Sequence, residues 1–313
     1  MDNLTHSIVG AVLGQAGLKR TTGLASPALI IGANLPDVDA ACFFWLEGTE
    51  HLAFRRGITH GPPALVLLPL ILAGLLWGFD RWQTKRGIRP EGRLPVRFGW
   101  LYGLAFIGCL AHPALDWLNV YGIRLLEPFS SQWFYGDTLF IIDVWLWAVL
   151  IASVWWSRRR EKAGADWVRP ARVGIAVGLA YIGMNGLVSA THGYHSTSRQ
   201  PGAAEISSPL PFLPFAREEI SGSRNEWYYL HDSAEAWVPF VKPEDRCEWP
   251  DFTEARRTNT QLDAFLFWSR APFATSAPDG SVILYDARFY DPRARGRFSV
   301  ALPDVRCEEL TLP

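Results

Sequence analysis

The stretch from Gly61 to Phe79, G-P-P-A-L-V-L-L-P-L-I-L-A-G-L-L-W-G-F, indicates the class of fold, because it contains no charged side chain. Its length is close to the roughly 20 apolar residues that a membrane-spanning helix needs. The runs from Phe98 to Leu115 and from Val173 to Thr191 are similar in length and equally free of Asp, Glu, Lys and Arg. We therefore predict that all three runs cross a membrane as helices.

Three further apolar runs complete the predicted helical region. Leu139 to Ser157 is interrupted only by Asp143, one turn inside its start. Leu4 to Leu18 and Thr21 to Pro36 fall below the usual spanning length. These two form either a hairpin of thin spans or a re-entrant pair, and buried helices of a soluble protein are the plainer alternative. We predict an all-α polytopic membrane helical bundle of about six apolar helices, within residues 1–195.

Basic residues orient this predicted bundle. The loops 80–97 and 158–172, together with Lys19 and Arg20, hold fourteen Lys and Arg, whereas the inter-helix loops on the opposite side hold three. Lys and Arg gather in the cytoplasmic loops of membrane proteins. We therefore predict that the first set is cytoplasmic and that both termini lie outside. The helix ends that carry His and Asp then share the outer face of the membrane.

The overall composition argues against one class of partner. A formal net charge of -1 provides no general attraction for nucleic acid, and anionic lipid accounts for the basic inner loops. We therefore expect no nucleic-acid partner. The 49% hydrophobic residues and 15 Trp fit a membrane protein with interfacial aromatic anchors.

The chain changes character after the last apolar run. From about Ser196 it is polar and interrupted by proline, with alternating segments from Ser281 to Phe289 and from Arg297 to Leu302. A turn signal, A-P-D-G, lies at positions 277–280 between apolar runs. We predict a small C-terminal β-rich domain, residues 196–313, which the topology places outside the cytoplasm.

Two cysteines, Cys247 and Cys307, fall within this C-terminal region. An oxidising compartment would favour a disulfide between them. Two separate buried thiols are an equally good interpretation, because spacing in the sequence cannot place the two Cα atoms within bonding reach.

The strongest chemical signal is H-P-A-L-D, from His112 to Asp116, because residues four apart share one face of a helix. Ionisable groups at membrane depth are retained mainly where they face a partner, a cavity or an ion. Asp37 and Asp39 follow the end of one apolar run, and His60 precedes the start of the next. Two imidazoles and two carboxylates suit Zn²⁺, and Mn²⁺ or Fe²⁺ are compatible with the same ligand types.

Other residues near these motifs have two interpretations each. His6 is either a further metal ligand or a satisfied core histidine. Whichever of Asp37 and Asp39 is not a ligand has an even chance of capping the helix expected at 40–46. Arg55 and Arg56 either extend toward the membrane interface or bind an anion beside His60.

An ordered set of motifs resembles a bacterial inner-membrane family of metal-dependent hydrolases, over roughly residues 1 to 195. The motifs are M-D-N-L-T-H-S from Met1, N-L-P-D-V-D from Asn34, R-G-I-T-H from Arg56, H-P-A-L-D-W-L-N from His112, then Tyr121-Gly122 and Gly136-Asp137. That family is distantly similar to zinc-dependent phospholipases C and single-strand nucleases, which are all-helical. Their metals are held by an early His, an Asp, a His and an H-x-x-x-D pair.

The resemblance implies a set of metal ligands in this chain: His6, Asp37 or Asp39, His60, His112 and Asp116. The phospholipase-like enzymes carry further His and Glu ligands after the H-x-x-x-D pair. This chain has no His between His112 and His192, so we expect one or two ions, with Asp116 as the natural bridging carboxylate. The expected location is a bacterial inner membrane, which the chain crosses several times.

We expect a membrane-embedded metal-dependent hydrolase that cleaves a phosphoester of a lipid or lipid-linked substrate. The metal would lower the pKa of a bound water to about 7. Asp37 is the candidate general base, and Arg55 and Arg56 are candidates to stabilise charge on a phosphoryl oxygen. The alternatives are an ion or proton transporter, and a metal-stabilised assembly protein without turnover. Protein partners do not follow from the sequence.

Overall fold

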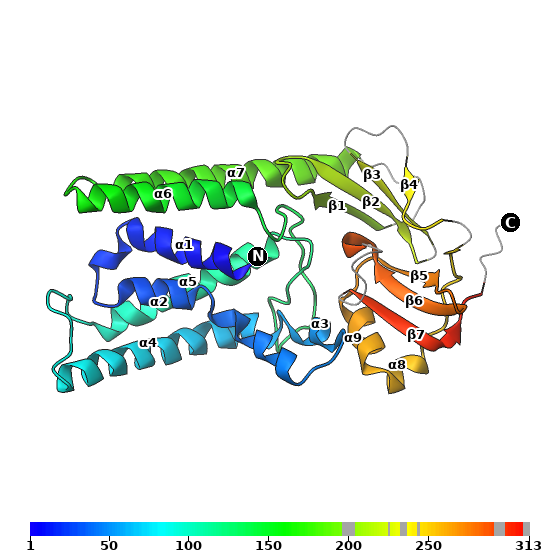
Figure 1. The fold of residues 1–313 in the computed structure, drawn as a ribbon, viewed down its shortest axis with the longest axis horizontal. Helices are drawn as coiled ribbons and strands as arrows, with labels where there is room; N and C mark the ends of the chain where they lie inside the picture. The colour runs from blue at the N-terminus through cyan, green and yellow to red at the C-terminus, as the bar shows by residue number, and fades with distance from the viewer. Residues whose placement is uncertain (196–203, 225, 232–236, 243–244, 291–297, 309–313) are drawn as a thin grey trace. The chain divides into compact units, whose positions relative to one another are not determined.

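The computed structural model describes residues 1–195, 204–224, 226–231, 237–242, 245–290 and 298–308. The chain forms two compact units, whose elements are drawn in Figure 1. The first unit comprises Met1–Asp39, Arg56–Gly186 and Pro211–Pro214, and the second comprises Ala40–Arg55, Leu187–Leu210 and Phe215–Pro313.

The first unit is helical. Asp2 caps its first helix by accepting the backbone N–H groups of Leu4 and Thr5, as Asp does at helix starts. Pro62 is the first residue of α4, a position where its missing N–H costs nothing. The elements are α1 (Asn3–Gln15), η1 (Leu18–Arg20), α2 (Ala25–Gly32), η2 (Leu35–Phe44, which continues into the second unit), η3 (Ile58–His60), α4 (Pro62–Lys85), α5 (Phe98–Trp117), α6 (Val144–Lys162) and α7 (Val168–His195, which also continues there).

The prediction of about six apolar helices is not supported. In the described part of the chain, α4, α5 and α7 are long and apolar enough to cross a membrane, and α2 with η2 adds a fourth candidate only if this pair, bent by 51°, is one span. Helix α1 has 13 residues and α2 has 8, which is too short to span. The last residues of helix α6 are the charged sequence R-R-R-E-K, so its apolar part is also short.

Glycines allow α1, α2 and α5 to pack closely. A Cβ on Gly108 would lie 2.5 Å from the carbonyl oxygen of Leu29, and one on Gly32 would lie 2.6 Å from that of Ala105. A Cβ on Gly10 would meet the backbone of Ile30 at 2.7 Å. Small residues of this kind let membrane helices approach until their backbones touch. This packing brings the ends of the three helices together.

The second unit contains two antiparallel sheets. The first is β1 (Ala204–Pro209), β2 (Arg217–Ser223), β3 (Glu226–His231) and β4 (Val238–Pro239), and the second is β5 (Pro272–Ser276), β6 (Ser281–Asp286) and β7 (Ser299–Arg306). Paired positions such as Ile206 with Ile220 and Phe273 with Tyr285 contribute to one buried core. The helical elements are α3 (Glu50–Phe54), α8 (Ala255–Thr258), α9 (Thr260–Trp268) and η5 (Ala287–Phe289). The prediction of a C-terminal β-sheet region is confirmed.

The predicted strands differ from the observed ones at their ends. The segment from Ser281 forms β6 only as far as Asp286, and its last residues form η5. The turn before it is present, with the Gly280 N–H donating to the Ala277 carbonyl at 2.9 Å. Strand β7 begins at Ser299, and Arg297 lies outside the described residues.

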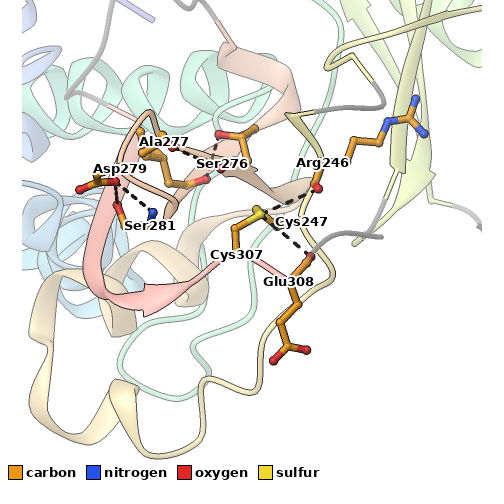
Figure 2. Close-up of a disulfide and its surroundings, with 10 residues drawn as sticks. Arg246, Cys247, Ser276, Ala277, Asp279, Ser281, Cys307 and Glu308 are labelled. Atoms are coloured by element: carbon orange, nitrogen blue, oxygen red, sulfur yellow. Dashed lines mark hydrogen bonds between the residues drawn. A yellow bond between two sulfur atoms is a disulfide. The ribbon is translucent and has the colours of Figure 1, made fainter. Parts of the chain in front are cut away.

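Figure 2 shows the disulfide between Cys247 and Cys307. Their Cα atoms lie 5.2 Å apart, which is within the usual bonding range. Of the two interpretations of these cysteines, the structure therefore supports the disulfide. The other two cysteines, Cys42 and Cys109, are buried.

Candidate metal centre

Side chains from three segments of the first unit form a group with metal-ligand chemistry. Asp37 comes from η2, His60 from η3, and His112 and Asp116 from successive turns of α5. One ligand atom from each of the four lies within 4.8 Å of the others. His60, His112 and Asp116 are buried, and Asp37 is partly buried.

The distances within this group leave room for an ion. His112 Nε2 lies 3.8 Å from Asp37 Oδ1 and 3.6 Å from Asp116 Oδ2. His60 Nε2 lies 3.8 Å from the same Asp116 oxygen. These separations are too long for hydrogen bonds. Two ligand atoms that each lie about 2.1 Å from one zinc ion are roughly 3 to 4 Å apart, so the spacing fits shared coordination.

The orientation of His112 is fixed by its backbone contact. Its Nδ1–H donates to the Ala33 carbonyl oxygen at 2.7 Å. Because a carbonyl can only accept, Nε2 carries the lone pair and faces the group. Nε2 is fully buried and has no hydrogen bond among the described residues. Metal-binding histidines are commonly oriented in this way by a bond from the other ring nitrogen.

Asp39 lies beside His60 and supports it. One carboxylate oxygen, Oδ2, accepts the Arg56 backbone N–H at 2.8 Å and the Thr59 hydroxyl at 3.2 Å. The Thr59 oxygen lies 3.0 Å from His60 Nδ1, and Asp39 Oδ2 lies 3.6 Å from the same nitrogen. This chain of contacts holds the His60 ring with Nε2 toward Asp116. Asp37 therefore belongs to the group of four, whereas Asp39 lies behind His60, on the side of its Nδ1 atom.

His6 extends the group on the other side of Asp116. Its ring stacks on that of His112, with centroids 3.8 Å apart. His6 Nε2 lies 3.4 Å from Asp116 Oδ1, and neither of its ring nitrogens has a hydrogen bond among the described residues. The α-amino group of Met1 also contacts Asp116 Oδ1.

Arg56 is buried and directed at Asp116. Its Nη2 donates to Asp116 Oδ1 at 3.2 Å, and its Nε lies 3.0 Å from Oδ2. Its Nη1 donates to Asn119 Oδ1 at 3.0 Å and to the Gly122 carbonyl at 3.2 Å. A guanidinium held this firmly fixes the carboxylate that it contacts.

Sequence reasoning gave no role to Asn119, Thr59 or the Met1 amino group. Asn119 lies three residues after Asp116, so a helical spacing was the only available signal. For Thr59, the only signal in the sequence is its position next to His60. Their roles depend on hydrogen bonds between segments far apart in the chain, which spacing does not reveal.

Other residues near the predicted motifs make different contacts. Arg55 is counted with the second unit, where its guanidinium lies over the Phe43 ring. Asp143 caps α6 and accepts the Tyr181 hydroxyl at 2.9 Å. Arg124 forms an ion pair with Glu127 at 2.8 Å. The side chains of His192 and His195 lie outside the described residues.

These features define a membrane protein with a helical membrane region and a possible metal-binding cluster. The model of the YdjM inner membrane protein family matches residues 1–191, and the chain belongs to this family. Comparisons with curated proteins and with solved structures gave no match.

Proposed function

We propose that the first unit is a membrane-embedded metal-dependent hydrolase that cleaves a phosphoester of a lipid or lipid-linked substrate. One observation carries the proposal: Asp37, His60, His112 and Asp116 converge on one point. A buried imidazole nitrogen without a hydrogen bond, His112 Nε2, is costly unless it binds something.

The donor set fits Zn²⁺ or a similar divalent ion. Two imidazoles and two carboxylates are ordinary ligands of Zn²⁺, Mn²⁺ and Fe²⁺. When bound, such an ion activates water and polarises a substrate oxygen. The two oxygens of Asp116 face different imidazoles, with Oδ2 toward His60 and His112 and Oδ1 toward His6. Asp116 could therefore supply ligand atoms to one or two ions.

The chain's own residues have separate roles in this proposal. The Asp37 side chain is 8% exposed, against 1% or less for Asp116 and His112, so Asp37 lies on the accessible side and is the candidate general base. Arg56 holds Asp116 in place and keeps positive charge at the site. A nearby cation favours an anionic substrate and the charge that develops on it.

Exposed apolar side chains adjoin the ligands and support a lipid substrate. Val38, next to Asp37, is 52% exposed, and Ile58, two residues before His60, is 56% exposed. Apolar side chains at the membrane interface would meet acyl chains while the site meets the head group. A carboxyl-ester or amide substrate would have less need of the cation at Arg56.

The test uses full-length protein in detergent, with metal content measured first. Wild type should retain a divalent metal, and His112→Ala should lose it. His51→Ala, a histidine outside the group, should keep it. Metal-loaded wild type and His51→Ala should release phosphate or phosphorylated head groups from bacterial lipid extract, and His112→Ala should not. Metal retained equally by all three proteins would contradict the site, whereas metal without lipid cleavage would favour a non-catalytic or transport role.

A further inference from the structure

A cavity lies between α6 and α7, and its lining contains none of the residues of the candidate metal centre. Its volume is about 490 Å³. All the residues that line the cavity, which fall within 149–177, belong to the first unit. Most of the lining is apolar: Val149, Ala152 and Trp156 from α6, and Val173 and Val177 from α7.

The two helices are in close contact at two residues that line this cavity, Ser153 and Gly174. A Cβ on Gly174 would collide with the Ser153 side chain, so α6 and α7 are in close contact there. Farther along α7, a Cβ on Gly178 would lie 3.5 Å from Leu146 and 3.7 Å from Leu150, so the two helices also pack there. The lining residues form a mainly apolar groove over these two helices, one of which is a candidate membrane span.

Two arginines lie at one end of the groove. Arg160 follows Trp156 by one turn of α6, and Arg169 lies in the first turn of α7. Arg160 donates Nε–H to the Asp166 carbonyl at 2.7 Å, which anchors the base of its guanidinium. Within the part of the chain that the structure describes, neither guanidinium forms an ion pair with a carboxylate, although nearby Lys19 does so with Glu161. The Asp166 carboxylate accepts the backbone N–H groups of Val168 and Arg169, which leaves both guanidinium groups available to an anion.

We propose that this groove binds an anionic phospholipid, with the phosphate held by Arg160 and Arg169 and one acyl chain along the groove. Arginine pairs suit phosphate because the guanidinium makes two parallel hydrogen bonds to its oxygens. The α6 segment from Val149 to Arg160 spans about 16 Å at a rise of about 1.5 Å per residue, which accommodates much of an acyl chain. Trp156 lies where an interfacial aromatic residue would meet the head group.

This lipid site is separate from the proposed hydrolase site. The basic residues of the predicted orientation place it at the cytoplasmic surface, where anionic lipids attract such clusters. Its occupant would be bound without being cleaved and would contact both α6 and α7. The inference does not depend on the proposed function.

The test compares two double variants that remove the same charge from one helix–loop region. Arg160→Gln with Arg169→Gln removes both groove cations, whereas Arg158→Gln with Arg159→Gln removes two exposed arginines outside the groove. Full-length protein in neutral detergent is titrated with phosphatidylglycerol, with phosphatidylcholine of the same chains, or with inorganic phosphate. Bound lipid is counted by native mass spectrometry, and the thermal unfolding midpoint is recorded.

Wild type and the exposed-arginine control should retain phosphatidylglycerol and unfold at higher temperature with it, and should not respond to phosphatidylcholine or phosphate. The groove variant should retain at least fivefold less. Val177→Trp, which fills the groove and leaves both arginines, should also lose retention, and it serves as the decisive variant if the double substitution does not fold. Equal retention by wild type and Val177→Trp, or an equal response to free phosphate, would overturn the proposal.

Discussion

Replacing Gly108 by Ala should weaken metal binding without altering any ligand. A Cβ at this position would lie 2.5 Å from the Leu29 carbonyl oxygen and 3.0 Å from the Ala33 amide nitrogen. Because the van der Waals contact distance between non-bonded heavy atoms is about 3.5 Å or more, α2 and α5 would have to separate by about 1 Å. His112 donates to the Ala33 carbonyl across this same contact, at 2.7 Å.

The separation would lengthen the His112–Ala33 hydrogen bond to as much as about 3.7 Å, which is no longer a hydrogen bond. Loss of a contact that orients a ligand lowers metal affinity by roughly 10- to 100-fold. That change corresponds to about 1.4 to 2.7 kcal/mol. The ligand set itself stays complete, so the variant should still bind metal at higher concentration.

The assay is competition for Zn²⁺ against a chromophoric chelator, using the full-length protein in detergent. Gly103→Ala is the matched control, because it lies on the same helix and a Cβ there meets nothing within 4 Å. Gly103→Ala should bind as wild type does. If Gly108→Ala and Gly103→Ala bound zinc equally well, the claim that α2 packing orients His112 would be refuted.

Two further predictions concern the second unit and the orientation in the membrane. Burial alone would raise the pKa of Asp286, but its bonds to Arg288 hold that pKa below the ordinary 3.8. Asp286→Asn should therefore lower the free energy of unfolding at pH 7 by about 3 kcal/mol. The difference in unfolding free energy between wild type and variant should disappear as the pH falls below 3.8 through the lower folded pKa, because protonation of Asp286 then removes the ion pair from wild type too. Unfolding followed by Trp fluorescence at several pH values measures this difference. A difference that does not change with pH would contradict the prediction. A reporter active only outside the cytoplasm should work when inserted near Gln132 and fail near Gly87, and the reverse pattern would invert the predicted orientation.

Much of the architecture was predictable from local pattern. The three longest uncharged runs correspond to α4, α5 and α7, because apolar length is a property of the sequence itself. The strands β6 and β7 followed from alternation and from the turn signal between positions 277 and 280. The predicted number of apolar helices was too high because the apolar runs in the sequence continue across breaks in the helices. Gly17 (φ 121°) follows α1, and α2 with η2 bends by 51°.

The sequence by itself determined which residues carry metal-ligand chemistry, since His112 and Asp116 must share a helix face at a spacing of four. It could not decide between Asp37 and Asp39, or between Arg55 and Arg56. Asp37 and Asp39 lie in the ten-residue η2, and Arg55 and Arg56 lie between α3 and η3, where a shift of one or two residues changes the direction of a side chain. Only the tertiary structure, through the close packing of α1, α2 and α5, places Asp37 with His112, sets Asp39 behind His60 and aims Arg56 at Asp116.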